Sequence, residues 1–382
     1  MIDEARLIDR LTRLVAFDTQ NPPGHEAECA AFVAAELRAA GCAVTTEEYA
    51  PGRVNVIGRL ENGPGPVFAF NTHMDVVPVG GGWSGAPLVL RAVGPDLVGR
   101  GACDAKGPLA AMIEAIALLA ADRANWSGTL MGVFVADEEA SSQGARHYAR
   151  SHPRIDLVVV GEPSGNAPII AHKGSLRPVV QVAGRMAHSG TPELGLNAIF
   201  QAGKLLPRFA AYHASLAARA HPLVGQPSLT VTRAMAGIAD NIVPDRCELL
   251  LDRRLVPGET EAAALEEIRA LLARAAAEDG VESEILRLKP TTGGAAETAP
   301  DHPIVLAAVD AARRHGVADP TPFGFQGACD FVHFRDIGAQ GVVMGPGDLA
   351  VAHKPDEFVP RAELAAAALI YRDIARAMLP RP

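Results

Sequence analysis

Short apolar runs typical of β-strands alternate with helical stretches along residues 1–173. The strand-like runs include VNVIGRL, VFAFNTH, LMGVFVAD and DLVVVGE, and residues 108–121 have the pattern of a helix between two of them. This alternation predicts an α/β fold, with helices on both faces of a mixed sheet, because strands buried on both sides need helices to cover them.

The alternation changes at residue 174. Residues 174–290 follow the order strand, helix, strand, strand, helix, strand, which predicts a ferredoxin-like βαββαβ domain that stands on its own. Residues 291–382 return to a helix, a strand (GAQGVVMG) and a final amphipathic helix. We therefore expect one domain built from 1–173 and 291–382, interrupted by a second domain at 174–290.

Composition excludes several classes of partner. The net charge is −9 and no block of lysine or arginine occurs, which argues against nucleic acid and anionic membrane. No apolar run reaches membrane-spanning length, and the charged N-terminus has the pattern of an amphipathic helix, not a secretion signal. The five cysteines are scattered and form no CxxC pair, so we expect a cytoplasmic protein with neither disulfides nor a thiolate zinc site.

Polar residues with metal-binding side chains follow the predicted strands of the first domain. In open α/β sheets, ligands gather at the carboxyl ends of strands, so residues far apart in sequence can surround one cleft. The residues that we expect to converge there are His73, Asp104, Glu138, Glu139, Glu162 and His353.

The chemistry of this set favours a metal centre. Carboxylates packed together without a cation would repel one another and raise their pKa values. Imidazoles and carboxylates without cysteine suit zinc, cobalt or manganese in an open catalytic site. The number of ligands favours two metals about 3.5–4 Å apart that share one carboxylate. Asp75 would then hold the His73 ring through the second ring nitrogen.

Each residue also has a simpler explanation when taken alone. Glu138 and Glu139 could be a solvated helix N-terminus, where acidic side chains are favoured, and Glu162 with Pro163 could form an ordinary turn. The combination favours the metal centre, because five separate strands would otherwise have to end in metal-binding residues by accident. The residues alone do not tell which of Glu138 and Glu139 binds metal.

Several motifs together resemble the dizinc metallohydrolase family that includes acetylornithine deacetylase, succinyl-diaminopimelate desuccinylase, aminoacylase and the glutamate carboxypeptidases. The resemblance spans about residues 7–375 and implies a zinc-exopeptidase-like catalytic domain interrupted by a lid domain that forms a homodimer. The motifs are NTHMDVVP, GRGACDAKGPLAA, ADEEASSQGA, VVVGEPS, RMAHSGTPELGLNAI, DNIVPD, DRRLVPGE and GPGDLAVAHKPDEFV.

The resemblance also implies a role for each metal ligand. His73 and Glu162 would bind one divalent ion, Glu139 and His353 would bind the other, and Asp104 would bridge them. Zinc is the expected metal, with cobalt as the alternative. The peptide after the bridging aspartate, Asp104–Ala105, would be cis, as it often is in this family.

The remaining catalytic roles follow from the same resemblance. Glu138 would be the general base that activates the attacking water, with Asp75 supporting the site. His188, in RMAHSG of the lid domain, would donate a hydrogen bond to the developing oxyanion and would do so from the partner chain. Without the resemblance, His188 could equally be a surface histidine in a glycine-rich turn.

Residues of two further motifs resemble substrate-binding positions. Arg254 and Asn241 would hold the substrate carboxylate, and the backbone N–H groups of Gly345 and Gly347 would lie beside it. Arg253 is a rival for the role of Arg254, and the spacing DxRxxP favours Arg254.

The predicted function is metal-dependent cleavage of the amide bond of an N-acyl amino acid, as in acetylornithine deacetylase or succinyl-diaminopimelate desuccinylase. A dipeptidase or glutamate-type carboxypeptidase of the same family is the alternative, followed by a homologue that binds metal without turnover. A nucleotide-dependent or serine enzyme has little support, because GxGxxG, GxxxxGK[ST] and GxSxG do not occur.

Overall fold

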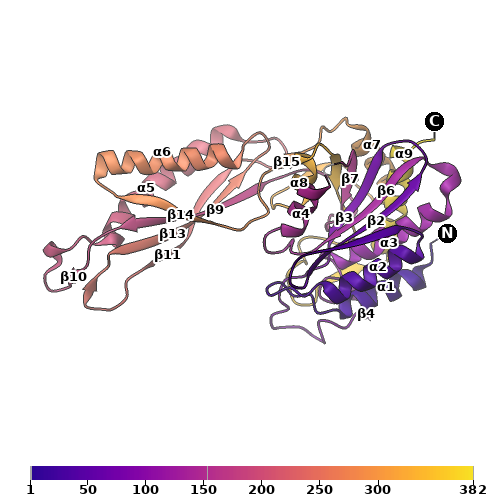
Figure 1. The fold of residues 1–382 in the computed structure, drawn as a ribbon, viewed down its shortest axis with the longest axis horizontal. Helices are drawn as coiled ribbons and strands as arrows, with labels where there is room; N and C mark the ends of the chain where they lie inside the picture. The colour runs from indigo at the N-terminus through magenta and orange to yellow at the C-terminus, as the bar shows by residue number, and fades with distance from the viewer. Residues whose placement is uncertain (1, 153, 382) are drawn as a thin grey trace. The chain divides into compact units, whose positions relative to one another are not determined.

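A computed structural model describes residues 2–152 and 154–381, and this part of the chain divides into two compact units (Figure 1). The first unit contains the chain up to Ile170, Thr298–Gly324, and the chain from Cys329 onward. The second unit contains Ala171–Glu297 and the short segment Phe325–Ala328. The sequence had predicted a domain of residues 174–290.

The first unit is built on a mixed sheet. Its strands follow the spatial order β1 (Ala43–Ala50), β2 (Arg53–Asn62), β6 (Gly128–Val135), β3 (Val67–His73), β7 (Leu157–Val160), β17 (Gln340–Val343) and β8 (Ile169–His172). Strands β6, β3, β7 and β17 are parallel, and the outer pairs are antiparallel. A separate small sheet has the order β18 (Phe358–Pro360), β5 (Asp96–Val98) and β4 (Arg91–Val93).

Strand β3 shows why a run such as VFAFNTH becomes a central strand. All seven of its residues are buried, because β6 and β7 pair with its two edges and helices cover the two faces of the sheet. The two polar side chains before the histidine still find acceptors: Asn71 Nδ2 donates to the Val133 carbonyl at 2.9 Å, and Thr72 Oγ1 donates to the Gly161 carbonyl at 2.8 Å. The donor groups of both side chains are therefore paired without solvent, whereas Asn71 Oδ1 is buried without a hydrogen-bond partner among the described residues.

Helices cover both faces of this sheet, as predicted. Neighbouring residues of β6 point to opposite faces. On one face, Gly132 packs against Ile116 of α3 (Lys106–Ala121), so closely that an added Cβ would lie 3.0 Å from the Ile116 side chain. On the other face, the sulfur of Met131 accepts a hydrogen bond from the hydroxyl of Tyr148 of α4 (Gln143–Ser151). The helices of the unit are α1 (Glu4–Ala16), α2 (Ala27–Ala39), α3 (Lys106–Ala121), α4 (Gln143–Ser151), α7 (Pro303–Arg314), α8 (Phe331–Asp336) and α9 (Arg361–Met378).

The second unit has the predicted βαββαβ order. Its elements are β9 (Gly174–Ala183), α5 (Ala198–Ser215), β11 (Ser228–Ala236), β13 (Arg246–Leu255), α6 (Glu261–Asp279) and β14 (Ser283–Lys289). The strands form an antiparallel sheet in the order β11-β13-β9-β14. Helices α5 and α6 share one apolar core with it, through side chains such as Phe209, Ile268 and Leu249. Thr260 caps the start of α6 and Gly280, at φ 65°, ends it.

Shorter elements complete the described chain. They are the ribbon of β10 (Ala187–His188) and β12 (Ile242–Val243), the strands β15 (Ala296–Glu297) and β16 (Phe323–Phe325), and the 3₁₀ turns η1 (Arg123–Asn125), η2 (Pro192–Leu194) and η3 (Leu216–Arg219). Across residues 2–152 and 154–381, no helix is both long and apolar enough to cross a membrane.

Candidate metal centre

The parallel strands bring most of the predicted residues to one edge of the sheet. His73 is the last residue of β3, and Glu138 and Glu139 follow the end of β6 at Val135. Glu162 follows β7, and His353 lies in the loop after β17. Because β3, β6, β7 and β17 are parallel, their carboxyl ends meet at the same edge, which is the convergence that the sequence predicted.

Asp104 reaches the cluster by a different route. The strand before it, β5, belongs to the small three-stranded sheet and ends at Val98, so Asp104 does not follow a strand of the main sheet as we had expected. It lies instead in the turn that leads into α3, and the Asp104–Ala105 peptide is cis, as the family resemblance implied. The turn places the carboxylate among side chains that come from the main sheet.

The two oxygens of Asp104 face different histidines. Oδ1 lies 3.2 Å from His73 Nε2, and Oδ2 lies 3.2 Å from His353 Nε2. His353 Nε2 is also 3.1 Å from Glu139 Oε2, and His73 Nε2 is 3.9 Å from Glu162 Oε1. A carboxylate shared between two ligand pairs is the arrangement expected of a residue that bridges two metal ions.

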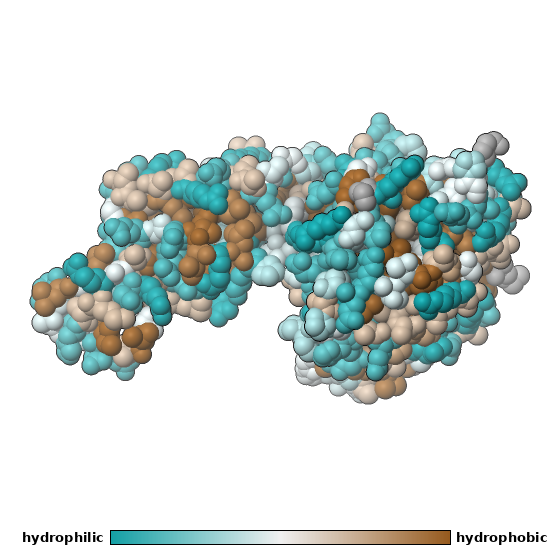
Figure 2. All heavy atoms as spheres, in the orientation of Figure 1, coloured by the Kyte–Doolittle hydropathy of each residue, from teal (hydrophilic) through white to brown (hydrophobic). Residues whose placement is uncertain are grey.

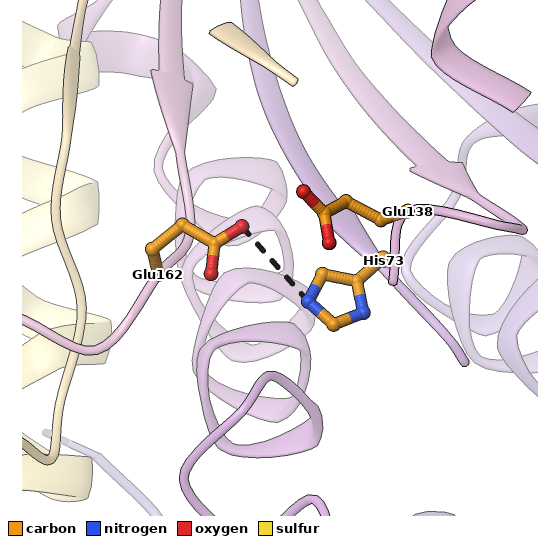
Figure 3. Close-up of side chains that lie close together, drawn as sticks. All are labelled: His73, Glu138 and Glu162. Carbon is orange, nitrogen blue, oxygen red and sulfur yellow. Dashed lines mark ion pairs between the residues drawn. The ribbon is translucent and has the colours of Figure 1, made fainter. Parts of the chain in front are cut away.

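Two overlapping groups of side chains in the described chain could hold an ion. One is His73, Glu138 and Glu162, shown in Figure 3 with both carboxylates near the imidazole ring, and the other is His73, Asp104 and Glu139. In each group the ligand atoms lie within 4.8 Å of one another. This geometry alone does not separate the proposed base, Glu138, from the ligands.

The electrostatics of the cluster fit a bound cation. Burial, and then the neighbouring charge of Glu162, raise the pKa of Glu138 well above its ordinary value. Burial also raises the pKa of Glu162 and of Glu139. One oxygen of Glu139, Oε1, is buried without a hydrogen-bond partner among the described residues. Metal ions would supply the positive charge and the missing partner.

The histidines respond to the same surplus of negative charge. Burial alone would lower the pKa of His73, but the acidic groups around it, Asp104 first among them, together outweigh burial and raise the pKa well above the ordinary value. Hydrogen bonds to Asp104 and then Glu139 raise the pKa of His353 to about 10. Burial would raise the pKa of Asp104, but its bonds to His353 and His73 lower it. Without metal, protons on the histidines take the place of the cations.

Asp75 contacts His73 differently from the prediction. The backbone carbonyl of Asp75 lies 2.9 Å from His73 Nδ1, whereas the nearest carboxylate oxygen lies 3.6 Å away. The carboxylate accepts the backbone N–H groups of Glu138 and Glu139 at 3.1 Å each. The side chain of Asp75 therefore holds the turn that carries the two glutamates, and its backbone orients the imidazole ring.

Sequence analysis did not identify Glu357, whose carboxylate holds the backbone of the turn that carries Asp104. Its Oε1 accepts the backbone N–H groups of Cys103 at 3.0 Å and Asp104 at 2.9 Å, and its Oε2 pairs with Arg100 at 2.5 Å. Both Glu357 and Arg100 are 1% exposed. No sequence pattern indicates this role, because the partners are separated by more than 250 positions.

The backbone donors expected in the Gly345–Gly347 loop already have partners. The Gly345 N–H donates to Ser164 Oγ at 3.1 Å, and the Gly347 N–H donates to Glu363 Oε2 at 2.8 Å. Gly347 has φ 87°, and a Cβ there would lie 2.5 Å from the Cys103 sulfur. These glycines fit a tight turn. Their N–H groups already donate to side chains of the protein, so they are not free to bind a substrate carboxylate as predicted.

The two rival arginines of the second unit have different environments. Arg253 is buried, pairs with Glu259 at 2.5 Å and donates to the Tyr212 hydroxyl at 3.2 Å. The Arg254 side chain is 30% exposed and pairs with Asp252 at 2.7 Å. The structure therefore gives Arg253 a role in packing this unit and leaves Arg254 accessible.

His188 ends β10, and Asn241 directly precedes β12, the strand that pairs with β10. The backbone N–H of Ser189 donates to the Asn241 carbonyl at 2.9 Å, and both His188 and Asn241 are exposed. His188 Nδ1 accepts the Gly190 N–H at 2.9 Å, which leaves Nε2 as the ring nitrogen that carries a proton in the neutral form.

Comparison with known proteins gives a consistent result. Residues 69–377 match peptidase family M20/M25/M40. The acetylornithine deacetylase of Myxococcus xanthus is 31% identical over 374 residues, which cover 93% of this chain and 92% of that protein. Among solved structures, an M20 family metallo-carboxypeptidase of Sulfolobus solfataricus has a TM-score of 0.79 at 18% identity, covering 99% of both chains. A dinuclear metal binding peptidase of Bacillus subtilis has a TM-score of 0.75 at 20% identity, covering 98% of both.

These matches confirm the predicted resemblance, the fold class, and the prediction of an enzyme that hydrolyses amide bonds with bound metal. The family match spans most of the chain, and the deacetylase relative is covered almost completely. The chain belongs to peptidase family M20/M25/M40.

Proposed function

We propose that this enzyme removes the acyl group from an N-acyl amino acid that carries a free α-carboxylate. The observation that carries the proposal is the shared Asp104, whose two oxygens each face a histidine within a cluster of buried carboxylates. The 31% sequence identity with the acetylornithine deacetylase of Myxococcus xanthus favours deacylation. Cleavage of a dipeptide or of a C-terminal residue is the second candidate, which the structural likeness to a metallo-carboxypeptidase keeps open.

The residues present fit a pair of divalent ions. We propose that His73 and Glu162 hold one ion, that Glu139 and His353 hold the other, and that Asp104 bridges them. The unpartnered Glu139 Oε1 and the raised pKa of Glu162 support this assignment. Zinc is the proposed metal, with cobalt as the alternative, because the ligands are imidazole and carboxylate without thiolate.

Catalysis would then depend on Glu138. When bound, the ions polarise the substrate carbonyl and lower the pKa of the attacking water. Glu138 takes the proton from that water and passes it to the leaving amine nitrogen as the C–N bond breaks. Burial suits Glu138 to this task, because a raised pKa helps a carboxylate to return its proton near neutral pH.

The second unit would supply recognition. Arg254 is accessible and planar, so it can bind both oxygens of the substrate carboxylate, and Asn241 would add a hydrogen bond. His188 would donate from Nε2 to the developing oxyanion. We propose that the second unit acts as the lid, with its boundaries near residues 174 and 290.

We also propose that the enzyme is a cytoplasmic homodimer in which His188 serves the partner's site. The five cysteines are free and buried, which suits a reducing compartment. The second unit exposes large apolar side chains, including Phe200 at 73%, Leu194 at 65% and Ile238 at 65%, and Figure 2 shows apolar side chains at its surface near β10. A second copy of the chain would cover them, since two-fold interfaces are the commonest.

A panel of substrates tests the proposed activity. N-acetyl, N-succinyl and N-formyl amino acids and unmodified dipeptides are incubated with protein loaded with zinc or cobalt, and the released amine is measured. Release from one acyl class, lost on replacing Glu138 by glutamine, supports the deacylase. Faster cleavage of dipeptides would favour the second candidate, and no release from any compound with metal bound would refute both.

Mixing two inactive variants tests the shared site. Homodimers of Glu138→Ala and of His188→Ala are dissociated, mixed and allowed to reassociate. If His188 acts across the dimer, one site of each heterodimer has both residues intact and activity returns. Heterodimers verified by mass spectrometry that stay inactive would refute the shared site.

A further inference from the structure

One side chain of the loop between α1 and α2, that of Asn21, contacts two aspartates next to the candidate metal ligands. Asn21 is 3% exposed, and its Nδ2 donates to Asp75 Oδ2 at 2.8 Å and to Asp137 Oδ1 at 2.9 Å. Its Oδ1 accepts from Arg53 Nη2 at 2.9 Å. Carboxylates only accept and guanidinium only donates, so these partners fix the orientation of the amide.

The two carboxylates that Asn21 joins both contact the turn that carries Glu138 and Glu139, and Asp137 Oδ2 accepts the Gln143 N–H at 3.4 Å where the turn ends. Asp75 accepts the backbone N–H groups of Glu138 and Glu139. Asp137 is the first residue of the turn, has φ 69°, and its backbone carbonyl accepts the Ser142 N–H at 2.6 Å. The amide of Asn21 thus links the end of β3 to the turn after β6.

Charge explains why a neutral donor is needed at this position. Asp75 and Asp137 are 0% and 5% exposed, and without donors between them two buried carboxylates would repel each other. Arg53 completes the network, with Nη2 3.2 Å from Asp137 Oδ1 and Nη1 2.5 Å from Glu26 Oε1. A shift of either aspartate would move the backbone that carries Glu138.

We propose that Asn21 is a positioning residue for the base Glu138 and the ligand Glu139, acting through Asp75 and Asp137. The inference rests on the proposed function, because it takes Glu138 as the base and Glu139 as a metal ligand. Residues that orient metal ligands from behind typically change metal affinity or activity by about 10–100-fold when replaced. We expect an effect of this size although Asn21 contacts neither substrate nor metal.

The test compares Asn21→Leu, which keeps the approximate volume without hydrogen bonds, with Asn21→Ser, which keeps one donor. The control is Asn62→Leu: Asn62 Nδ2 also donates to two carbonyls, of Arg123 at 2.7 Å and Trp126 at 2.6 Å, at the far end of β2. Zinc affinity of the metal-free protein is measured by competition with a chromophoric chelator. Values of kcat and KM are then measured at saturating zinc.

We expect Asn21→Leu to weaken zinc binding and lower kcat by about 10–100-fold each, with KM changed less than about threefold. Asn21→Ser should lie between Asn21→Leu and the wild type, and Asn62→Leu should match the wild type in both measurements. If Asn21→Leu does not fold, Asn21→Ser against Asn62→Leu decides the question. Wild-type zinc affinity and kcat in a folded Asn21 variant would overturn the inference.

The two measurements separate this inference from the proposed function. An active wild type whose Asn21 variants keep both kcat and zinc affinity refutes the positioning role alone. A wild type that binds zinc but releases no amine from any compound refutes the proposed function, and the zinc competition still decides whether Asn21 positions the ligands.

Discussion

Replacing Glu357 by glutamine should destabilise the first unit strongly, although the change is small in size. Glu357 Oε1 accepts two backbone N–H groups, and the amide oxygen of glutamine can still do so. The second oxygen becomes an NH₂ group that faces Arg100, whose guanidinium then loses its anion. The other acceptors near Arg100 are backbone carbonyls at 3.4 Å, too distant to replace a carboxylate.

The magnitude follows from the burial of the pair. With both partners 1% exposed, removing one charge leaves the other buried and unpaired, which costs about 3–5 kcal/mol of unfolding free energy. Glu357→Ala should cost more, because two buried N–H groups also lose their acceptor, at about 1–3 kcal/mol each. The control Glu61→Gln breaks an ion pair with Arg59 whose side chains are 67% and 46% exposed, and it should cost at most about 1 kcal/mol.

Tryptophan fluorescence can report this unit alone. Both tryptophans of the chain, Trp83 and Trp126, lie in the first unit. Arg100 lies over the Trp83 ring at 5.1 Å, so a Trp83→Phe background leaves the buried Trp126 as the probe of unfolding. Urea unfolding is measured with a chelator present, so that altered metal affinity does not contribute. A loss below about 1 kcal/mol for Glu357→Gln, equal to that of Glu61→Gln, would refute the reasoning from the buried pair.

Three further predictions concern catalysis, substrate and metal. Glu138→Gln should lower kcat by about 10²-fold or more with metal content unchanged, whereas Glu139→Gln should weaken one metal; elemental analysis beside kcat would expose the reverse assignment. Arg254→Ala should raise KM strongly for substrates with a free α-carboxylate but change KM little for the corresponding amides. Equal effects on both would reject Arg254 as the residue that binds the carboxylate. In metal-free protein, the pKa values of Glu138, Glu162 and His353 are raised on folding, so the stability from their protons should fall as pH rises from about 5 to about 10. Thermal unfolding across that range should show this slope without zinc and a smaller one with about two zinc ions bound per chain, and identical slopes would contradict it.

Several features of the protein could be predicted because they depend on local periodicity and residue chemistry. Apolar runs of strand length and helical spacing predicted both the α/β unit and the βαββαβ unit. The residues at or just after the ends of β3, β6 and β7 could be predicted as metal ligands from their side chains and from the rule that parallel strands end at one edge. The assignment of Glu138 and Glu139 to different roles needed the family resemblance and stays a prediction.

Other features depend on which segments meet in space, and local patterns do not record that. The strand order places β6 between β2 and β3, and this brings Asp137 and the two glutamates beside Asp75 and the Asn21 loop. A long-range contact also fixes the turn of Asp104, because Glu357, 253 positions away, accepts its backbone N–H.

Burial and hydrogen bonding decided the remaining cases. Arg253 is buried in its unit while Arg254 is accessible, and the glycine N–H groups near residue 345 are already bonded. Sequence spacing could not reveal these differences, because a side chain is buried or paired according to neighbours from other elements. The sequence by itself thus determined which reactive side chains the chain carries, and the tertiary structure decided which neighbouring groups position those side chains.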